Sequence, residues 1–468
     1  MRWVSSLPRS TPEAQGINPA ALDAFVGALD ASEQEIQTLM VVRHGHVVLA
    51  EEWSPYRLAD RHLLASVSKS FTSMAIGLAI EAGLLSVDDK VVSFFDGDDL
   101  PEKIGENLAA MEVRHLLTMS TGHADDTIDR IGRAGDSDGR MVRAFLALEV
   151  EHEPGAPFVY NTGATYILSA ILQKVTGEKL LDYLWPRLFE PLGATEAIWE
   201  TSPEGINVGG WGLSLSTGSL AAFGQFLLQR GAWEGRQLVP AEWIDAATSK
   251  QVSNADRDTA DWQQGYGYQF WRARHNSYRG DGAFGQYCIV LPDLDASVII
   301  TSASKDMQAT MNVVWDHLLP ALEGAEVEAV PRPERLELLP PTGAAPQPGD
   351  GKTYRFDENN PAGLSAVRLD PEGTGTFTFE GNRPGTSGTQ DLTFAQGDWQ
   401  EQTFVLPDTH ERLVTSAYGD GDAFVATTRL LATPFVLTLT CRPTGETLTV
   451  DGTWNVQFGP LEFTIASS

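Results

Sequence analysis

The sequence places a serine and a lysine three positions apart, and such a pair could supply a nucleophile and its base. Ser66 and Lys69 precede an apolar run, Phe71 to Ile80, which Gly83 ends, and this pattern predicts a helix that begins at Ser66. Residues i and i+3 share a helix face, so the amine would lie beside the hydroxyl. The helix dipole favours a neutral amine and a developing alkoxide there. A serine that attacks a carbonyl needs a base this close, although Ser-x-x-Lys alone also occurs in many exposed helices.

Two later segments carry groups that such a pair would need. Tyr160 stands in the stretch Pro157 to Thr162, ahead of a predicted helix, where its phenol could face a cleft. The glycine-rich stretch from Gly280 to Gln286 leads into a predicted hairpin. Its glycines would let a strand edge approach a bound carbonyl and direct backbone N–H groups at it.

The predicted helices and strands fall into two groups separated by a linker. Before the linker, the patterns predict a sheet built from both ends of the region, with helices between its strands. The helices are expected at 19–29, 66–82, 164–175, 220–229 and 311–322, and the hairpins at 39–51 and 286–302. Prolines and glycines then mark a linker over residues 326–351. Downstream, short alternating runs predict an all-β domain, a small barrel, over 352–468. The first domain is expected to span 1–325.

Composition limits the classes of function. The chain has 468 residues with 42% hydrophobic and 21% charged, which is typical of a globular protein of two or three domains. The formal net charge of −30 argues against nucleic acid and anionic membranes as partners. Only two cysteines occur, so a disulfide framework and a cysteine metal site are not expected. No segment reads as a signal peptide or a bilayer span, and we expect cytoplasmic residence.

The chain resembles the serine β-lactamase and penicillin-binding-fold hydrolases, whose marks are Ser-x-x-Lys, Tyr-x-Asn and a Lys/His-x-Gly strand motif. Within that family it is similar to the branch of family VIII esterases and 6-aminohexanoate-dimer hydrolases. The resemblance runs from about Thr11 to Gly324, and the segment after the linker resembles lipocalin-like domains appended to some members. The matching stretches are 39–45, 66–73, 115–122, 158–177 and 209–213.

The resemblance implies a role for each matching position. Ser66 becomes the nucleophile, Lys69 its base or proton relay, and Tyr160 the second base and leaving-group acid. The backbone N–H groups of Ser66 and Ala283 become the oxyanion hole. Substrate contacts are expected at Thr162, Gly280, Gly282 and Trp211, although Trp211 could equally be packed in the core. The implied reaction is hydrolysis of small esters or amides through an acyl-enzyme, with no metal or organic cofactor, and the oligomeric state stays unknown.

Two departures from the family pattern bear on the substrate. Thr162 holds the asparagine position of Tyr-x-Asn, with Asn161 one place early, and Gly280 holds the position of the Lys or His of the third motif. A penicillin carboxylate would find no cation at Gly280, which favours neutral esters or amides. Two alternatives stay open: a β-lactamase or DD-peptidase, and a non-catalytic ligand-binding protein on the same fold. His123 lacks zinc-site spacing and is predicted at the surface.

Overall fold

The computed structural model describes residues 6–155, 157–357, 360–380, 389–406 and 409–467. The chain divides into two compact units. The first contains Met1–Glu51, Arg61–Ser302 and Asp306–Pro333, and the second contains Glu52–Asp60, Ala303–Lys305 and Glu334–Ser468. Two short stretches of the N-terminal part, 52–60 and 303–305, therefore group with the C-terminal unit. In the described part of the chain, no helix combines the length and apolar character needed to cross a bilayer.

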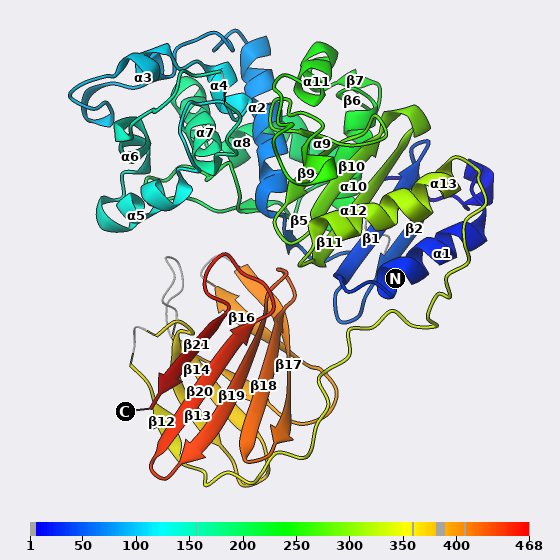
Figure 1. The fold of residues 1–468 in the computed structure, drawn as a ribbon, viewed down its shortest axis with the longest axis vertical. Helices are drawn as coiled ribbons and strands as arrows, with labels where there is room; N and C mark the ends of the chain where they lie inside the picture. The colour runs from blue at the N-terminus through cyan, green and yellow to red at the C-terminus, as the bar shows by residue number, and fades with distance from the viewer. Residues whose placement is uncertain (1–5, 156, 358–359, 381–388, 407–408, 468) are drawn as a thin grey trace. The chain divides into compact units, whose positions relative to one another are not determined.

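A six-stranded sheet is the framework of the first unit (Figure 1). Its order is β2-β1-β11-β10-β9-β8, so strands from the two ends of the unit meet at β1 and β11, as the sequence predicts. β9, β10 and β11 pair antiparallel, and Cys288 on β10 lies opposite Gly280 on one side and Ile299 on the other. The strands are β1 (Glu35–Arg43), β2 (His46–Glu52), β8 (Trp271–Arg272), β9 (Tyr278–Gly282), β10 (Gln286–Leu291) and β11 (Ala296–Ala303).

Helices cover both faces of this sheet. α1 (Pro19–Asp30) packs against β1, and α12 (Met307–Val313) lies beside it and continues through a π-helical segment into α13 (Leu319–Leu322). α10 (Thr217–Leu228) packs against β1 and β10 on the other face (Figure 1). Because both faces are covered, β10 and β11 are buried along their whole length and contain mostly apolar residues.

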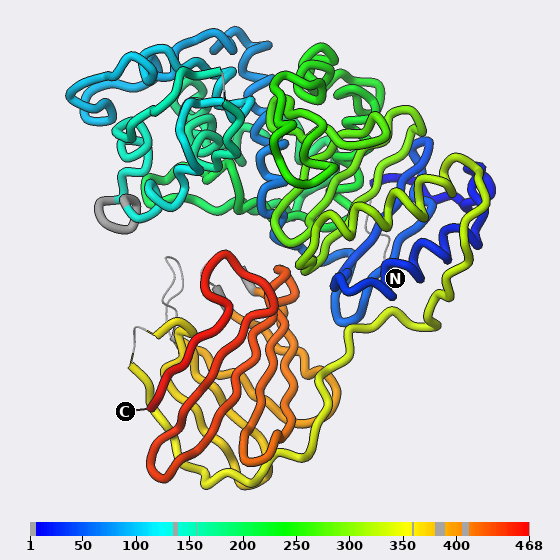
Figure 2. Tube along the Cα trace, viewed as in Figure 1, coloured from blue at the N-terminus to red at the C-terminus, as the bar shows by residue number. Residues whose placement is uncertain are grey.

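The helix that follows Ser66 lies between the sheet and a helical lobe. α2 (Ser68–Glu81) runs through the middle of the first unit (Figure 2). It is buried from Ser68 to Ala79, polar residues of its first turns included. Phe71 anchors it, since its ring stacks on Phe223 with centroids 3.9 Å apart and on Phe189 at 5.7 Å. The lobe and its neighbours contain α3 (Glu106–Ala110), α4 (Val113–Leu117), α5 (Ile128–Asp138), α6 (Met141–Ala147), α7 (Thr162–Thr176), α8 (Leu180–Leu184), α9 (Glu190–Leu192) and α11 (Ala241–Thr248).

Small strands complete the first unit, and one of the predicted boundaries needs correction. β3 (His62–Leu63), β5 (Leu213–Leu215) and β4 (Ile198–Trp199) form a three-stranded sheet, and β6 (Ala232–Trp233) pairs with β7 (Arg236–Gln237). The helix predicted from Ser66 begins at Ser68, because Ser66 lies in a 3-10 turn over Ala65–Val67. The other predicted helices are present with small shifts of their ends, whereas α3 to α6, α8, α9 and α11 were not predicted.

The second unit is all-β, as predicted, but its described strands form two antiparallel sheets rather than one closed barrel. Apolar residues of both sheets, including Phe377, Phe394 and Leu439, share one core. Alternating runs predict that a strand buries one face, but they do not say whether the sheet closes. The strands are β12 (Thr353–Arg355), β13 (Leu364–Leu369), β14 (Gly375–Glu380) and β15 (Thr389–Phe394) in one sheet, and β16 (Gln400–Leu406), β17 (Thr409–Asp420), β18 (Ala423–Leu430), β19 (Val436–Thr444), β20 (Thr447–Trp454) and β21 (Glu462–Ala466) in the other.

Candidate functional site

The turn before α2 carries backbone strain at Ala65, the residue that precedes Ser66. Ala65 has φ of 46°, in the left-handed region that residues with a side chain seldom adopt. Ser68 holds the turn in place, because its hydroxyl donates to the Ala65 carbonyl at 2.6 Å and accepts from the Leu213 N–H at 3.1 Å. Ser66 itself stays half-buried, so its hydroxyl can reach solvent. The strained turn thus presents a serine at the helix end where a negative charge is favoured.

Lys69 lies directly against this serine. Its Nζ donates to Ser66 Oγ at 2.9 Å and to the Gly210 carbonyl at 2.8 Å, with a longer contact of 3.4 Å to Thr162 Oγ1. The side chain is 1% exposed. Burial lowers the pKa of the Lys69 amine to about 7, while the carboxylates of Asp126 and Asp281 act in the opposite direction. An amine with that pKa is largely uncharged slightly above neutral pH, as a general base must be.

Tyr160 completes a cluster of three groups around the serine hydroxyl. Its phenol interacts with the Ser66 side chain, and its ring lies 4.8 Å from Lys69 Nζ. The ring stacks on Trp271 with centroids 5.3 Å apart and meets Tyr266 edge-on at 6.3 Å. Burial, and next the charge of Asp281, raise the pKa of the phenol well above its ordinary value. The phenol therefore stays protonated at neutral pH.

The end of β9 lies against the turn that holds Ser66. A Cβ on Gly282 would lie 2.2 Å from the Leu64 carbonyl oxygen and 3.1 Å from the Ser66 nitrogen, so only glycine fits there. Ala283 follows in the turn between β9 and β10, and Gln286 holds this turn by donating to the Ala283 carbonyl at 3.2 Å. The close approach thus brings the Gly282 backbone next to Ser66, and the oxyanion hole at Ala283, one residue further on, stays a prediction.

At Gly280, where the family motif has a Lys or His, the surrounding side chains leave little room for a longer side chain. A Cβ on Gly280 would lie 2.8 Å from Ser70 Oγ and 3.3 Å from Val67 Cγ1, so no longer side chain fits without a shift. The neighbouring Arg279 does not substitute for it. Arg279 is fully buried, donates through Nε to Asp281 at 2.9 Å, and packs over the Trp262 ring at 4.3 Å.

The remaining predicted contacts lie beside the same cluster. Thr162 is the first residue of α7, and its N–H donates to Asp126 at 2.8 Å. Asn161 caps that helix through its side chain and is fully buried, so it serves the helix rather than the cleft. Trp211 is half-buried, and its carbonyl accepts from Trp199 Nε1 at 2.8 Å.

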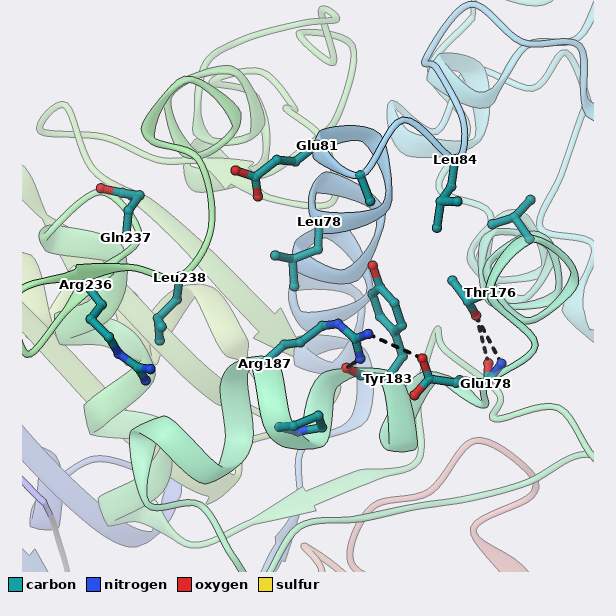
Figure 3. Close-up of a pocket in the computed structure, with 13 residues that line it drawn as sticks. Leu78, Glu81, Leu84, Thr176, Glu178, Tyr183, Arg187, Arg236, Gln237 and Leu238 are labelled. Carbon is teal, nitrogen blue, oxygen red and sulfur yellow. Dashed lines mark hydrogen bonds and ion pairs between the residues drawn. The ribbon is translucent and has the colours of Figure 1, made fainter.

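A hollow of about 630 Å³ elsewhere in the first unit is not this site (Figure 3). It lies at the C-terminal end of α2, where Leu78 and Glu81 face it. Leu78 is more than two helical turns beyond Lys69, or about 13 Å along the axis. Arg187 is held in this hollow by Tyr183, whose ring it covers at 4.0 Å, and by Glu178 at 3.4 Å.

Comparison with known proteins identifies the fold around the cluster. The Beta-lactamase family matches residues 23–322. The chain belongs to the Beta-lactamase family. It is 26% identical over 331 residues to the 6-aminohexanoate-dimer hydrolase of Paenarthrobacter ureafaciens, covering 64% of this chain and 82% of that one. It is 25% identical over 170 residues to the lovastatin esterase of Penicillium rubens, covering 32% and 42% of the two chains.

A solved structure shows the same fold at low sequence identity. A putative 6-aminohexanoate-dimer hydrolase from Bacillus anthracis superposes with a TM-score of 0.57 and 19% identity, covering 68% of this chain and 88% of that one. The predicted family is therefore confirmed, and the chain is a β-lactamase-related hydrolase. The roles of its individual residues remain predictions.

Sequence reasoning missed several groups that this Beta-lactamase-family site brings together. The Gly210 carbonyl contacts Lys69, and the carboxylates of Asp126 and Asp281 lie within electrostatic reach of its amine. Neither carboxylate matches a family motif, and a backbone carbonyl leaves no signal in a sequence. The surface prediction for His123 was wrong: it is fully buried, with Nδ1 at 2.9 Å from the Thr121 hydroxyl.

Proposed function

We propose that the protein hydrolyses esters or amides of small molecules through an acyl-enzyme on Ser66. The observation that carries this proposal is the 2.9 Å contact between Lys69 Nζ and Ser66 Oγ, made by an amine whose pKa is lowered to about 7. An uncharged amine at this distance can accept the serine proton as the oxygen attacks the substrate carbonyl. A merely structural lysine would not need to be desolvated beside a serine.

Acylation then proceeds through groups already in place. Ser66 Oγ bonds to the carbonyl carbon while its proton passes to Lys69, and the oxyanion is bound by the N–H groups of Ser66 and Ala283. The Tyr160 phenol delivers a proton to the leaving alcohol or amine as its bond to the carbonyl carbon breaks. Lys69 restores that proton to the phenol oxygen, which leaves the acyl group on Ser66.

Water completes the cycle by the same route in reverse. A water molecule attacks the acyl carbon and gives its proton to the Tyr160 oxygen as the phenol proton passes to the Lys69 amine, and Lys69 returns that proton to Ser66 Oγ as the acid departs. Thr162, Gly280, Gly282 and Trp211 are proposed to contact the substrate. Lipocalin-like character of the second unit and cytoplasmic residence remain proposals that rest on the sequence.

A β-lactamase or DD-peptidase reaction is the second candidate, supported by the family itself. The closed position at Gly280 and the burial of Arg279 count against it, because they leave no cation for a substrate carboxylate at the third motif. A non-catalytic binding protein is disfavoured by the intact cluster of Ser66, Lys69 and Tyr160.

Covalent labelling tests the proposed function directly. Incubation with a fluorophosphonate, followed by intact mass and peptide mapping, should give one adduct on Ser66, and Ser66→Ala should lose both the adduct and p-nitrophenyl ester turnover. Ser68→Ala is the matched control for a serine of the same turn. Labelling that persists in Ser66→Ala would overturn the proposal. A panel of p-nitrophenyl esters, aminohexanoate dimers and nitrocefin then separates the esterase, amidase and β-lactamase reactions.

A further inference from the structure

The strand beside the nucleophile carries a carboxylate. Asp281 stands on β9 between Gly280 and Gly282, and Gly282 approaches the Ser66 nitrogen. Its charge acts on both Lys69 and Tyr160. The carboxylate is therefore part of the catalytic cluster, although the reaction as described above makes no use of it.

The protein supplies a hydrogen-bond partner to one oxygen of this carboxylate. Arg279 Nε donates to Asp281 Oδ2 at 2.9 Å, and no residue that the structure describes donates to Oδ1. Burial raises the pKa of the Asp281 carboxyl, while the charges of Arg279, Lys69 and Arg257 act in the opposite direction. Asp281 retains 6% exposure, whereas Arg279 is fully buried. A ligand that reaches Oδ1 would therefore meet the negative end of the ion pair.

Further contacts of Arg279 hold the Arg279–Asp281 ion pair in this orientation. Arg279 also donates through Nη1 to the Asp261 carbonyl at 2.9 Å and to the Arg272 carbonyl at 3.3 Å, and its guanidinium lies over two tryptophan rings. The cation is thereby held on the inner side of the strand. Another cation, Arg257, lies over Trp271 at 5.4 Å and is exposed, so water screens its charge far more than that of Asp281.

We propose that Asp281 is a specificity-determining residue that favours substrates bearing an ammonium group and disfavours those bearing a carboxylate. This inference rests on the proposed hydrolysis at Ser66 and names its substrate class. An ammonium group can take the free oxygen as its partner, whereas a carboxylate would have to approach a like charge in a poorly solvated site. The net charge of −30 also attracts cationic substrates as they approach from solution.

Isosteric substrate pairs measure this preference without changing shape. One pair places the charge in the acyl group: the p-nitrophenyl esters of 4-(trimethylammonio)butyrate and 5,5-dimethylhexanoate. The other places it in the leaving group: acetylthiocholine and 3,3-dimethylbutyl thioacetate. Because the quaternary ammonium does not titrate, the ratio of kcat/KM within a pair reports the charge preference alone. At least one pair should show a ratio of about ten in favour of the cation, equivalent to about 1.4 kcal/mol.

Asp281→Asn should abolish that preference, because the amide keeps the size of the side chain but loses its charge. Arg257→Gln is the matched control, and it should retain the preference. Since Asp281→Asn leaves Arg279 buried without its counter-ion, the double variant Asp281→Asn/Arg279→Gln removes both charges and should give the same loss. Fluorophosphonate labelling of Ser66 checks that each variant is folded.

Two results would overturn the inference. One is a wild-type ratio at or below one for both pairs, and the other is a preference that survives in a labelled Asp281 variant. Neither affects the proposed function, which fails only if Ser66→Ala retains labelling and turnover.

Discussion

Replacing Lys69 with methionine should stabilise the protein while it abolishes activity, and the gain should depend on pH. In water the lysine amine has a pKa near 10.5, whereas burial lowers the pKa of Lys69 to about 7. Between these values the unfolded chain binds the proton and the folded chain does not. The unfolded state therefore holds more protons in this window, and the stability contributed by this group rises with pH.

The size of the effect follows from the two pKa values. At pH 6 both states are largely protonated, and the shift of about 3.5 pKa units costs the folded state about 5 kcal/mol. At pH 9 only the unfolded state gains from protonation, and the cost falls to about 2 kcal/mol. Loss of the hydrogen bond to the Gly210 carbonyl, about 1–3 kcal/mol, applies equally at both values. The change that Lys69→Met makes to the free energy of unfolding should thus be about 3 kcal/mol more stabilising at pH 6 than at pH 9.

Denaturant unfolding of both proteins at pH 6 and pH 9, followed by tryptophan fluorescence, measures this double difference. Lys103→Met is the control, since Lys103 is exposed and its replacement should give the same small change at both pH values. A double difference of zero for Lys69→Met would mean that the amine stays protonated in the folded state up to pH 9. The proposed base would then be a fixed cation, and the reasoning from burial would be refuted.

Three further outcomes are expected. The rate of fluorophosphonate labelling should fall about tenfold per pH unit below about pH 7 and level off above it, since only the uncharged Lys69 amine accepts the serine proton; a profile that is flat from pH 5 to 8 would contradict this. Tyr160→Phe keeps the stacking on Trp271 and should leave the unfolding midpoint nearly unchanged while kcat falls about 100-fold; an unchanged kcat would remove the phenol from the mechanism. Gly282→Ala places a methyl group 2.2 Å from the Leu64 carbonyl and should lose labelling, whereas Gly105→Ala, with open space around it, should not; equal labelling would show that the strand can move away from Ser66.

The family and the grouping of Ser66, Lys69 and Tyr160 could be predicted from the sequence because they depend on local patterns. Ser66 and Lys69 are three residues apart at a helix start, and that spacing alone places them on one face. Tyr160 precedes a recognisable helix, and Gly280 to Gln286 lead into a hairpin whose alternation marks two strands. Each motif needs only its own neighbours to be recognised, and their order along the chain then gives the family.

The chemistry of the site was decided by tertiary structure. Whether Lys69 is a base depends on its burial against Gly210 and Tyr160, which come from segments about 90 to 140 residues away in the chain. The sequence shows that Gly280 lacks a cation, but only the packing of Ser70 against it shows that a longer side chain would fit only after a shift. Asp281 carries no motif signal at all. Its orientation is set by Arg279, two residues away, which is itself held by the Asp261 carbonyl and the Trp262 ring. Contacts between separate segments fix solvation and electrostatics, and they cannot be seen in a linear pattern.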